Sequence, residues 1–362
     1  MNLDTVMKKQ KISQNLNIMN NVKKIRVTLY CEYYRFMNGV FFKGAEMGFL
    51  TSFKNQMKIL TREGVQWTED LSQPCDVFQA NAQGLRTMWL IQKYKHRGIP
   101  TIIYAHATAE EWTNAFRGLH YVAFIYKWFL IKLYNSADKV ICVSEYNKQI
   151  IHERYNVPFE KLVFISNGVD AARFEFNELK RKEFRHELKI EDNELFIINV
   201  AIVLFKKGIG TFIELAKNFP QIKFYWFGKI FTRAAEKIPL YPKNISFFGF
   251  APDIVAAYSA GDIFIFPSYE ENQGISVLEA GARGLPILVR DIPVYYSWLQ
   301  DGINCLKAKT NEEFIYKLSL LLTDSNLRNK LGATAKEMVF RDHSLESVGK
   351  KLMNLYGTLI RT

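Results

Sequence analysis

The chain has 362 residues, of which 48% are hydrophobic, and its 48 basic against 36 acidic residues give a net charge of +12. This length exceeds what one hydrophobic core usually supports, so we expect two domains. The positive charge favours an anionic partner, either nucleic acid or an acidic lipid surface. The four cysteines are far apart and lack C-x-x-C spacing, which argues against a disulfide framework and against a zinc site.

Residues 1–22 are polar and basic and lack the apolar core of a signal peptide, so we expect a disordered tail and a cytoplasmic protein. From residue 23 onward, short apolar runs rich in β-branched and aromatic residues alternate with helical patterns, which is typical of parallel α/β sheets. The predicted strands form two groups: 24–31, 100–106, 138–144 and 161–168, then 195–203, 222–228, 262–268 and 286–291.

The two groups predict two doubly wound, Rossmann-like domains, residues 23–171 and residues 172–344, with a charged linker at 172–194 that contains no strand. We expect a final helix at 345–362 to pack back on the first domain. Ligands of open α/β sheets bind at the carboxyl ends of the strands. Two facing domains therefore predict a site in the cleft between them.

Three features of the first domain could belong to such a site. Gly44 and Gly48 follow the first strand and open a helix, either as a loop near a ligand or as an ordinary turn. His106 closes a strand at the cleft edge, either as a site residue or as a buried structural histidine. The aromatic and cationic stretch 112–135 is too short and too charged to span a bilayer, so it either lies in the headgroup layer or packs in its own core. Its candidates for membrane or acceptor contact are Trp112, Arg117, Lys127, Trp128 and Lys132.

In the second domain, the segment EENQGISVLEA at 270–280 follows a buried strand and predicts a short helix that begins at a glycine. The first N–H groups of that helix, at Gly274, Ile275 and Ser276, would face the cleft. They suit a diphosphate because they lack intrahelical acceptors and the helix dipole is positive there.

Two glutamates flank this helix start. Glu271 precedes the helix, and Glu279 lies one turn inside it with a side chain that leans back toward the amino end. Both can accept hydrogen bonds from sugar hydroxyls of a ligand at the helix end. The alternative is that Glu271 only favours the helix dipole and Glu279 is an ordinary solvated residue.

The segment PSYEENQGISVLEAGARGLPILVRDIPVYYSWLQDGINCL resembles the donor-site signature of the retaining glycosyltransferases of family 4, which have the GT-B fold, including the E-x7-E motif. NGVD at 167–170, KKG at 206–208 and the run GFAPDIVAAYSAGDIFIFPS extend the resemblance to nearly everything after residue 23. The resemblance implies two Rossmann-like domains that face an interdomain cleft.

The resemblance also implies roles for single residues of the donor site. Glu271 would contact the transferred hexose and Glu279 the nucleotide ribose. Lys207 matches the lysine that family members place on the diphosphate, but Ala201 and Ile202 stand where a Gly-Arg pair is common. Lys206 is therefore the candidate for the second positive charge, although KKG could also be a basic surface turn.

On the acceptor side, the resemblance places His106 beside the reacting sugar as a hydrogen-bond partner in the transition state, and Gly48 in a loop near the donor phosphate. Retention in this family is ascribed to front-face attack, in which the leaving phosphate takes the acceptor proton. The sequence has no D-x-D tripeptide and no His/Cys cluster with ligand spacing, so we expect no metal or cofactor. Lys207 and the helix end would then stabilise the charge of the leaving diphosphate.

AHATAEEWTNAFRG and KWFLIKLYNSADKVICVSEYNKQII resemble the bacterial synthases that add a second hexose to monoglucosyl-diacylglycerol. This resemblance implies UDP-glucose or UDP-galactose as donor, a glycolipid acceptor, and a peripheral position on the inner face of the cell membrane. No nucleic acid is expected, because the chain lacks a recognisable binding module. The alternatives are a polysaccharide or polyprenyl-linked acceptor, and a non-catalytic carbohydrate-binding relative.

Overall fold

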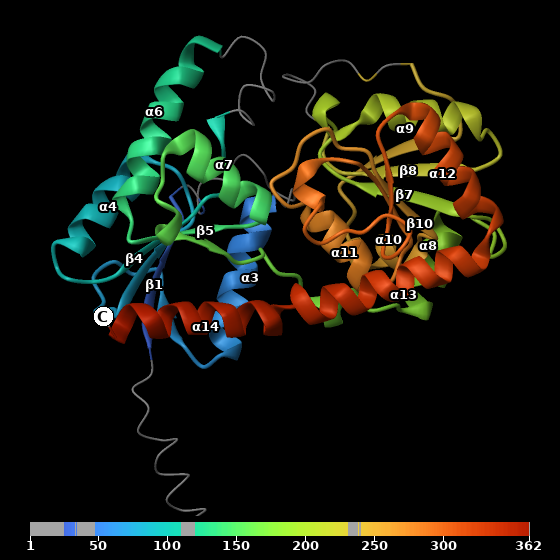
Figure 1. Cartoon of the computed structure of the whole chain (residues 1–362). Coiled ribbons are helices and arrows are strands. Elements are labelled where there is room, and N and C mark those ends of the chain that lie inside the picture. Colours follow the sequence, from blue (N-terminus) through green and yellow to red (C-terminus); the bar gives the residue numbers. More distant parts are fainter. Residues whose placement is uncertain are drawn as a thin grey trace, which may run out of the picture.

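The computed structural model describes residues 25–32, 34, 48–109, 120–230, 238 and 240–361. These residues form two parallel sheets of six strands each, with helices on both faces of each sheet (Figure 1). The expected class, α/β with two doubly wound domains, is confirmed. The tail at 1–22, and with it Gly44, Trp112 and Arg117, lies outside the described residues.

The first sheet has the strand order β2-β1-β3-β4-β5-β6. Its strands are β1 (Arg26–Tyr30), β2 (Gln66–Thr68), β3 (Val77–Ala80), β4 (Thr101–Tyr104), β5 (Lys139–Cys142) and β6 (Leu162–Phe164). Its helices are α3 (Gly48–Arg62), α4 (Leu85–Lys95), α6 (His120–Ser136) and α7 (Glu145–Tyr155). One face of the sheet packs on α4, α6 and α7, and the other packs on α3 and on the last helix of the chain, α14 (Leu345–Arg361).

The second sheet has the order β12-β11-β10-β7-β8-β9. Its strands are β7 (Phe196–Val200), β8 (Lys223–Phe227), β9 (Ile245–Gly249), β10 (Ile263–Phe266), β11 (Ile287–Arg290) and β12 (Leu306–Ala308). Its helices are α8 (Glu178–Glu187), α9 (Ile209–Asn218), α10 (Ile254–Ala260), α11 (Ile275–Arg283), α12 (Asn311–Thr323) and α13 (Ser325–Asp342). The helices α9 and α12 cover one face, and α10, α11 and α13 cover the other.

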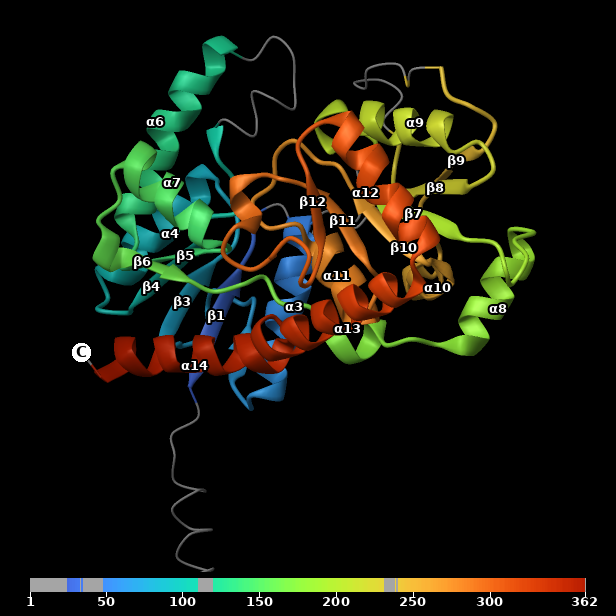
Figure 2. The same cartoon turned by 45° about the vertical axis from the view of Figure 1, so that its right-hand side comes forward.

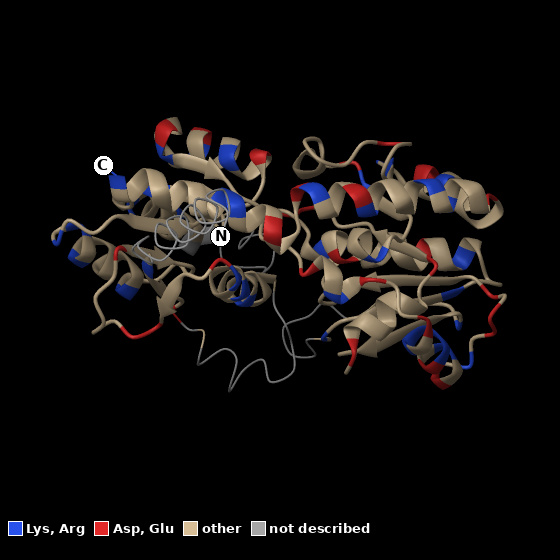
Figure 3. Ribbon diagram, turned by 90° about the horizontal axis from the view of Figure 1, so that it is seen from below, with Lys and Arg blue, Asp and Glu red and all other residues tan. Residues whose placement is uncertain are grey.

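The chain crosses between the domains twice, and the two crossings pair with each other. The N–H of Val169 donates to the carbonyl oxygen of His343 (2.9 Å), and the N–H of Leu345 donates to that of Val169 (3.1 Å). Beyond this point α14 runs under the first domain, as Figures 1 and 2 both show. There the buried Tyr356 hydroxyl donates to Oε1 of Gln79 on β3 (2.6 Å). Seen from below, α13 and α14 connect the two domains (Figure 3).

The segment 172–194 is not the free linker that its charge suggested. It contains α8, which packs on α10, and Phe184 lies in the second core. Arg185 is only 1% exposed because its guanidinium bonds Asp262 and the carbonyl oxygen of Ala260. The crossing itself is shorter and lies just before it, around Val169.

The eight predicted strands all exist, within a few residues of their predicted ends. Four further strands escaped the sequence pattern: β2, β3, β9 and β12. Two of these, β2 and β12, have only three residues each, and they lie at sheet edges where the alternation of apolar residues is weak.

Candidate active site

The start of α11 is shaped by a glycine. Gly274 adopts the left-handed conformation (φ 87°), and a Cβ there would lie 3.1 Å from the Tyr295 hydroxyl oxygen. The helix therefore begins beside a residue without a side chain, Gly274. Its first residues are Ile275 and Ser276. The N-terminal residue of α3, Gly48, faces this point across the domains, since a Cβ on Gly48 would lie 3.9 Å from Cδ1 of Ile275. Two helix starts from different domains thus meet, which gives a positive environment.

Lys207 and Glu271, 64 residues apart, are brought together beside this helix start. The ammonium group of Lys207 forms an ion pair and hydrogen bond with Oε1 of Glu271, and both side chains are largely buried. Lys207 lies on the short 3-10 helix η4 (Phe205–Lys207). The next residue, Gly208, has φ 81°, and a Cβ there would lie 2.1 Å from the carbonyl oxygen of Pro267. The glycine of KKG is therefore needed for η4 to pack on the exit of β10.

Glu279 is oriented by a buried tyrosine. The hydroxyl of Tyr258 on α10 lies 2.8 Å from Oε2 of Glu279 and 3.1 Å from the carbonyl oxygen of Ser276. Burial and the neighbouring Glu279 carboxylate raise the pKa of Tyr258 well above its ordinary value, so the hydroxyl keeps its proton and acts as donor. This contact fixes the carboxylate one turn above the helix start.

His106 lies two residues beyond the end of β4, at the carboxyl edge of the first sheet. Its ring stacks on that of Tyr104, with 5.2 Å between centroids. Its Nε2 atom is buried and has no hydrogen-bond partner among the described residues. Burial lowers the pKa of His106 to about 4, so the imidazole is neutral at pH 7. A buried, unpaired polar atom at a cleft edge is costly, which points to a role with a ligand.

Two side chains of the E-x7-E loop tie the domains together. Asn272 donates from Nδ2 to the carbonyl oxygen of His106 (2.8 Å). Gln273, only 2% exposed, accepts from the N–H of Asn167 (2.9 Å) and donates to the hydroxyl oxygen of Ser166 (2.7 Å). The loop that carries Glu271 is therefore bonded directly to the first domain and to the crossing segment. Sequence reasoning passed over both residues, although two amides between the motif's glutamates were a visible signal.

The chain matches family models and a known protein along most of its length. A family model described as Glycosyltransferase Family 4 matches residues 56–173, and one described as Glycosyl transferases group 1 matches residues 180–338. The processive diacylglycerol alpha-glucosyltransferase of Acholeplasma laidlawii is 31% identical over 318 residues, which cover 86% of this chain and 93% of that relative. The chain belongs to glycosyltransferase family 4.

This glycosyltransferase is also similar to the alpha-galactosylglucosyldiacylglycerol synthase of Streptococcus pneumoniae, with 30% identity over 186 residues, or 47% of this chain and 48% of that one. Its fold matches the structure of HepE from Anabaena with UDP-glucose, with a TM-score of 0.72 at 14% identity over 92% of this chain and all of that one. The expected GT-B fold is therefore confirmed.

The glycosyltransferase has no arginine at the start of its KKG loop, and the nearby Arg290 makes hydrogen bonds within the second domain. The guanidinium of Arg290 donates to the carbonyl oxygens of Pro267 (3.0 Å) and Lys309 (2.8 Å) and to the hydroxyl of Thr211 (2.7 Å). It also lies 3.9 Å from the ring centre of Tyr269. These contacts hold Arg290 against the exit of β10, the end of β12 and the helix α9.

Lys206 stands beside Lys207 on η4, and its main chain is fixed from the exit of β10. Its carbonyl oxygen accepts from the N–H of Tyr269 (2.8 Å) and from the hydroxyl of Ser268 (3.2 Å). At the position of the missing Gly-Arg pair, the carbonyl oxygen of Ala201 accepts a hydrogen bond from Nε1 of Trp226 (2.7 Å). Lys206 therefore remains the candidate for the second charge.

The predicted residues of α6 do not gather at Glu271. A cavity of about 80 Å³ beside Glu271 is lined from the first domain by Thr108 and by three residues of α7. On α6, Lys127 is half-buried with Nζ 5.7 Å from the ring centre of Tyr155, whereas Trp128 is 56% exposed. Lys132 is exposed and lies over the Trp128 ring at 5.7 Å.

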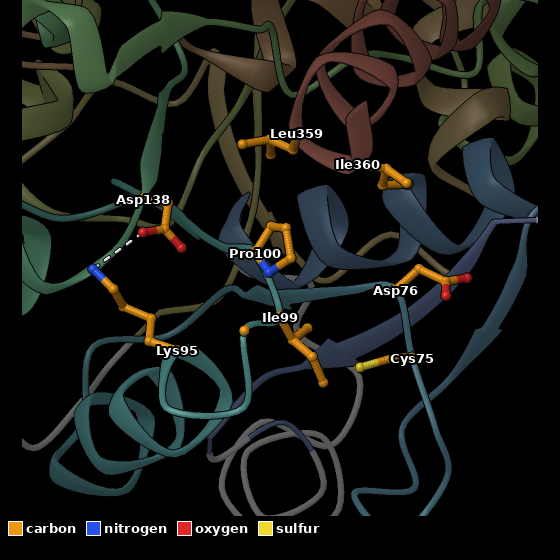
Figure 4. Close-up of a pocket in the computed structure, with 9 residues that line it drawn as sticks. Cys75, Asp76, Lys95, Ile99, Pro100, Asp138, Leu359 and Ile360 are labelled. Carbon is orange, nitrogen blue, oxygen red and sulfur yellow. Dashed lines mark ion pairs between the residues drawn. The ribbon is translucent and has the colours of Figure 1, made fainter. Parts of the chain in front are cut away.

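A larger cavity, about 610 Å³, lies at the amino ends of the strands of the first sheet, opposite the carboxyl ends near His106 (Figure 4). It is lined by residues that precede strands, such as Asp76, Pro100 and Asp138, and by the end of α14. Its charged groups are already paired, with Lys95 Nζ 3.1 Å from Asp138 and Asp76 bonded to Arg26. Because ligands of open sheets bind at the carboxyl ends, this cavity is not the candidate site.

Neither a metal site nor a membrane span is found among the described residues. Within them, no group of three or more histidine, cysteine, aspartate or glutamate side chains is placed to hold a metal ion. No helix in this part of the chain is long and apolar enough to cross a bilayer.

Proposed function

We propose that this glycosyltransferase moves a hexose, glucose or galactose, from a UDP-sugar to a hydroxyl of a membrane glycolipid such as monoglucosyl-diacylglycerol. The observation that carries the proposal is the convergence of Glu271, Lys207 and the start of α11 opposite His106. The names of the two diacylglycerol-directed relatives support the acceptor class. The UDP-glucose bound to HepE supports the donor class.

In the proposed complex, the diphosphate lies on the N–H groups of Ile275 and Ser276 and near Lys207. As the bond between the anomeric carbon and the phosphate oxygen breaks, negative charge grows on the diphosphate, and these fixed donors stabilise it. Lys207 forms an ion pair with Glu271. Its ammonium group can therefore contact both the carboxylate that binds the hexose and the phosphate. We propose that no metal ion is required, because this lysine and the helix end provide the positive charge.

The proposed stereochemistry is retention by front-face attack. The acceptor oxygen bonds to the anomeric carbon on the side that the phosphate leaves, and the acceptor proton passes to a phosphate oxygen. His106 is a poor base because its pKa lies near 4, so its neutral ring acts as a hydrogen-bond partner of the reacting sugar. Glu271 orients a hexose hydroxyl, and Glu279, held by Tyr258, accepts from the ribose.

The experiment supplies radiolabelled UDP-glucose or UDP-galactose to the purified protein with monoglucosyl-diacylglycerol in mixed micelles. We expect a labelled diglycosyl lipid with one of the two donors, and an α-linkage by NMR from an α-linked donor. Glu271→Gln should abolish transfer while the fold is retained. Transfer only to a polyprenyl-linked sugar would replace the proposed acceptor. Donor binding without any transfer would favour a carbohydrate-binding relative.

A further inference from the structure

A buried serine at the crossing between the domains is bonded by three parts of the chain. Ser166 follows β6 and is only 1% exposed. Its hydroxyl oxygen lies 2.7 Å from Nε2 of Gln273 in the E-x7-E loop, 3.2 Å from the backbone nitrogen of Gly168 and 2.9 Å from Nδ1 of His343. Gln273 and His343 are 107 and 177 residues away in the sequence, so only the folded arrangement of both domains brings them to this serine.

The amide of Gln273 can be oriented in only one way. Its Oε1 accepts from the N–H of Asn167 (2.9 Å), and a backbone N–H group can only donate. Nε2 of Gln273 therefore faces the hydroxyl oxygen of Ser166 and donates to it. Because Gln273 is buried, bulk water does not compete for either end of this amide.

The number of protons at Ser166 then fixes the state of His343. The hydroxyl oxygen accepts from Nε2 of Gln273 and from the N–H of Gly168, which occupies both of its lone pairs. Its single proton is left for Nδ1 of His343, which must therefore be the unprotonated nitrogen of the ring. Burial lowers the pKa of His343 to about 4, so the ring is neutral at pH 7 and can accept this proton.

Both domains hold the segments around Ser166. The carbonyl oxygen of His343 accepts from the N–H of Val169 (2.9 Å), and its ring packs on the indole of Trp298 in the second domain, with 5.2 Å between ring centroids. From the first domain, Nδ2 of Asn55 on α3 donates to the carbonyl oxygen of Gly168 (2.8 Å). These contacts lie where the segment between α13 and α14 passes from one domain to the other (Figures 1 and 2).

Gln273 also adjoins the groups that hold the proposed donor. Glu271 precedes it by two residues, and Gly274, at the start of α11, follows it directly. Since Gln273 is fixed at both ends of its amide, the short backbone between it and Glu271 has little freedom. Asn272 restrains the same stretch through its bond to the carbonyl oxygen of His106. The position of the Glu271 carboxylate thus depends on contacts at the domain crossing.

We propose that Gln273 is a positioning residue, and that the contacts Gln273–Ser166–His343, the Ser166 relay, align the Glu271 carboxylate with the hexose during transfer. The inference rests on the proposed function and deepens it, because the relay acts on the reaction through Glu271. Alignment matters because a displacement of about 1 Å at a reacting centre can slow a reaction about a hundredfold. Hydrogen bonds are directional, so a buried amide fixes the loop in one position where an apolar side chain would only fill space.

The test compares purified full-length variants in steady-state kinetics of transfer from the UDP-sugar, with the affinity for UDP measured separately by calorimetry. Gln273→Met keeps the length of the side chain and removes both hydrogen bonds. We expect kcat to fall about tenfold or more, because two buried bonds that align Glu271 are lost. We expect the Kd for UDP to change less than about threefold, because UDP carries no hexose for Glu271 to hold.

His343 is tested by two substitutions that differ in one hydrogen-bond acceptor. His343→Asn places an amide oxygen near the position of Nδ1 and should keep kcat within about threefold of the wild type. His343→Leu fills the space without an acceptor and should lower kcat about fivefold or more, because the proton of Ser166 loses its partner. Since both residues act through Ser166, kcat of the double variant Q273M/H343L should lie within about twofold of that of Q273M.

The matched control is Gln79→Met. Gln79 is also fully buried and uses both ends of its amide, with Gln56 and Tyr356, in the first domain. Its loss should lower the melting temperature and leave kcat unchanged, and far-UV circular dichroism verifies that each variant folds. Equal kcat in Gln273→Met and the wild type, or an equal loss of kcat in Gln79→Met, would overturn the proposal. Losses that multiply in full in Q273M/H343L would also overturn it, because the two residues would then act separately.

Failure of this inference can be told apart from failure of the proposed function. Release of UDP from the UDP-sugar without an acceptor reports the donor half of the reaction alone. If the wild type releases UDP but transfers no hexose to the glycolipid, the proposed acceptor fails, and the same variants test the relay on UDP release. If transfer is intact and Gln273→Met equals the wild type, the relay fails alone. If the wild type consumes neither UDP-sugar, both proposals fail.

Discussion

At the scale of single residues, the site depends on buried contacts that fix charged groups at the start of α11. Lys207 meets Glu271, Tyr258 meets Glu279, and Asn272 meets the main chain of His106. Each contact joins residues that are distant in sequence, so each has a substitution that should affect donor binding or catalysis more than folding.

Replacing Lys207 by methionine removes the ammonium group and keeps the length of the side chain. We expect kcat/KM to fall about a hundredfold or more, because the leaving diphosphate loses a fixed charge. Steady-state kinetics with the UDP-sugar measure the loss. Lys217→Met, at an exposed lysine of α9, is the control and should have no effect. Equal kinetics in the two variants would remove Lys207 from the site.

Replacing Tyr258 by phenylalanine removes only the hydroxyl that positions Glu279. We expect KM for the donor to rise about fivefold with a smaller change in kcat, because one hydrogen bond contributes about 1 kcal/mol. Tyr356→Phe removes a similarly buried hydroxyl on α14 and should lower stability without changing KM. An unchanged KM in Tyr258→Phe would show that Glu279 is not needed for donor binding.

At the scale of elements, two features position the loop that carries Glu271. They are the KKG loop and the segment between α13 and α14. η4 packs on the exit of β10 only because Gly208 has no side chain. His343, just after the end of α13, contacts the hydroxyl of Ser166 through Nδ1 (2.9 Å). The same hydroxyl oxygen accepts a hydrogen bond from Nε2 of Gln273. Both features connect a helix end to the loop that carries Glu271.

Gly208→Ala would place a methyl group 2.1 Å from the carbonyl oxygen of Pro267 in a left-handed backbone. We expect a loss of roughly 1–3 kcal/mol in unfolding free energy and a weaker grip on the donor phosphate. Gly210→Ala lies two residues on, in the helix α9, with nothing within 4 Å of its Cβ. It should instead be neutral or stabilise by about 0.5–1 kcal/mol. Urea unfolding compares the two.

Burial lowers the pKa of His343 to about 4 from an ordinary value of 6.5. Between these values the unfolded chain binds more protons than the folded chain, so the unfolding free energy falls as pH falls from about 6.5 to about 4. His106 adds a loss of the same sign, and each loss should amount to roughly 3 kcal/mol. Urea titrations of His343→Gln should show a shallower decline, whereas the exposed control His96→Gln should match the wild type.

Much of the arrangement of helices and loops could be predicted from the sequence. The features that could not be predicted have physical causes. The start and end of α11 were predictable because Gly274 and Gly284 act locally, through their own left-handed backbone. The helix α8 was mistaken for part of a linker, because its arginines look solvent-exposed in sequence yet bond Asp262 in the fold. Contacts such as Gln273 with Ser166 depend on how two domains meet, which no local pattern encodes.

At the scale of the whole molecule, two domains of the same architecture face each other and touch through the E-x7-E loop. The cavity beside Glu271 measures about 80 Å³, below the roughly 300 Å³ of a typical small-molecule site, so we expect the domains to move apart when a donor sugar binds. The chain crosses between the domains at Val169 and Leu345, so we expect the motion to occur there.

The most direct test of the central claim is a crystal structure with UDP-glucose bound. The account predicts that the diphosphate lies within hydrogen-bond distance of the N–H groups of Ile275 and Ser276 and of Lys207. It also predicts that the ribose contacts Glu279 and the hexose contacts Glu271. A nucleotide bound elsewhere, for example in the cavity at the amino ends of the first sheet, or bound here with both glutamates turned away from it, would contradict the account.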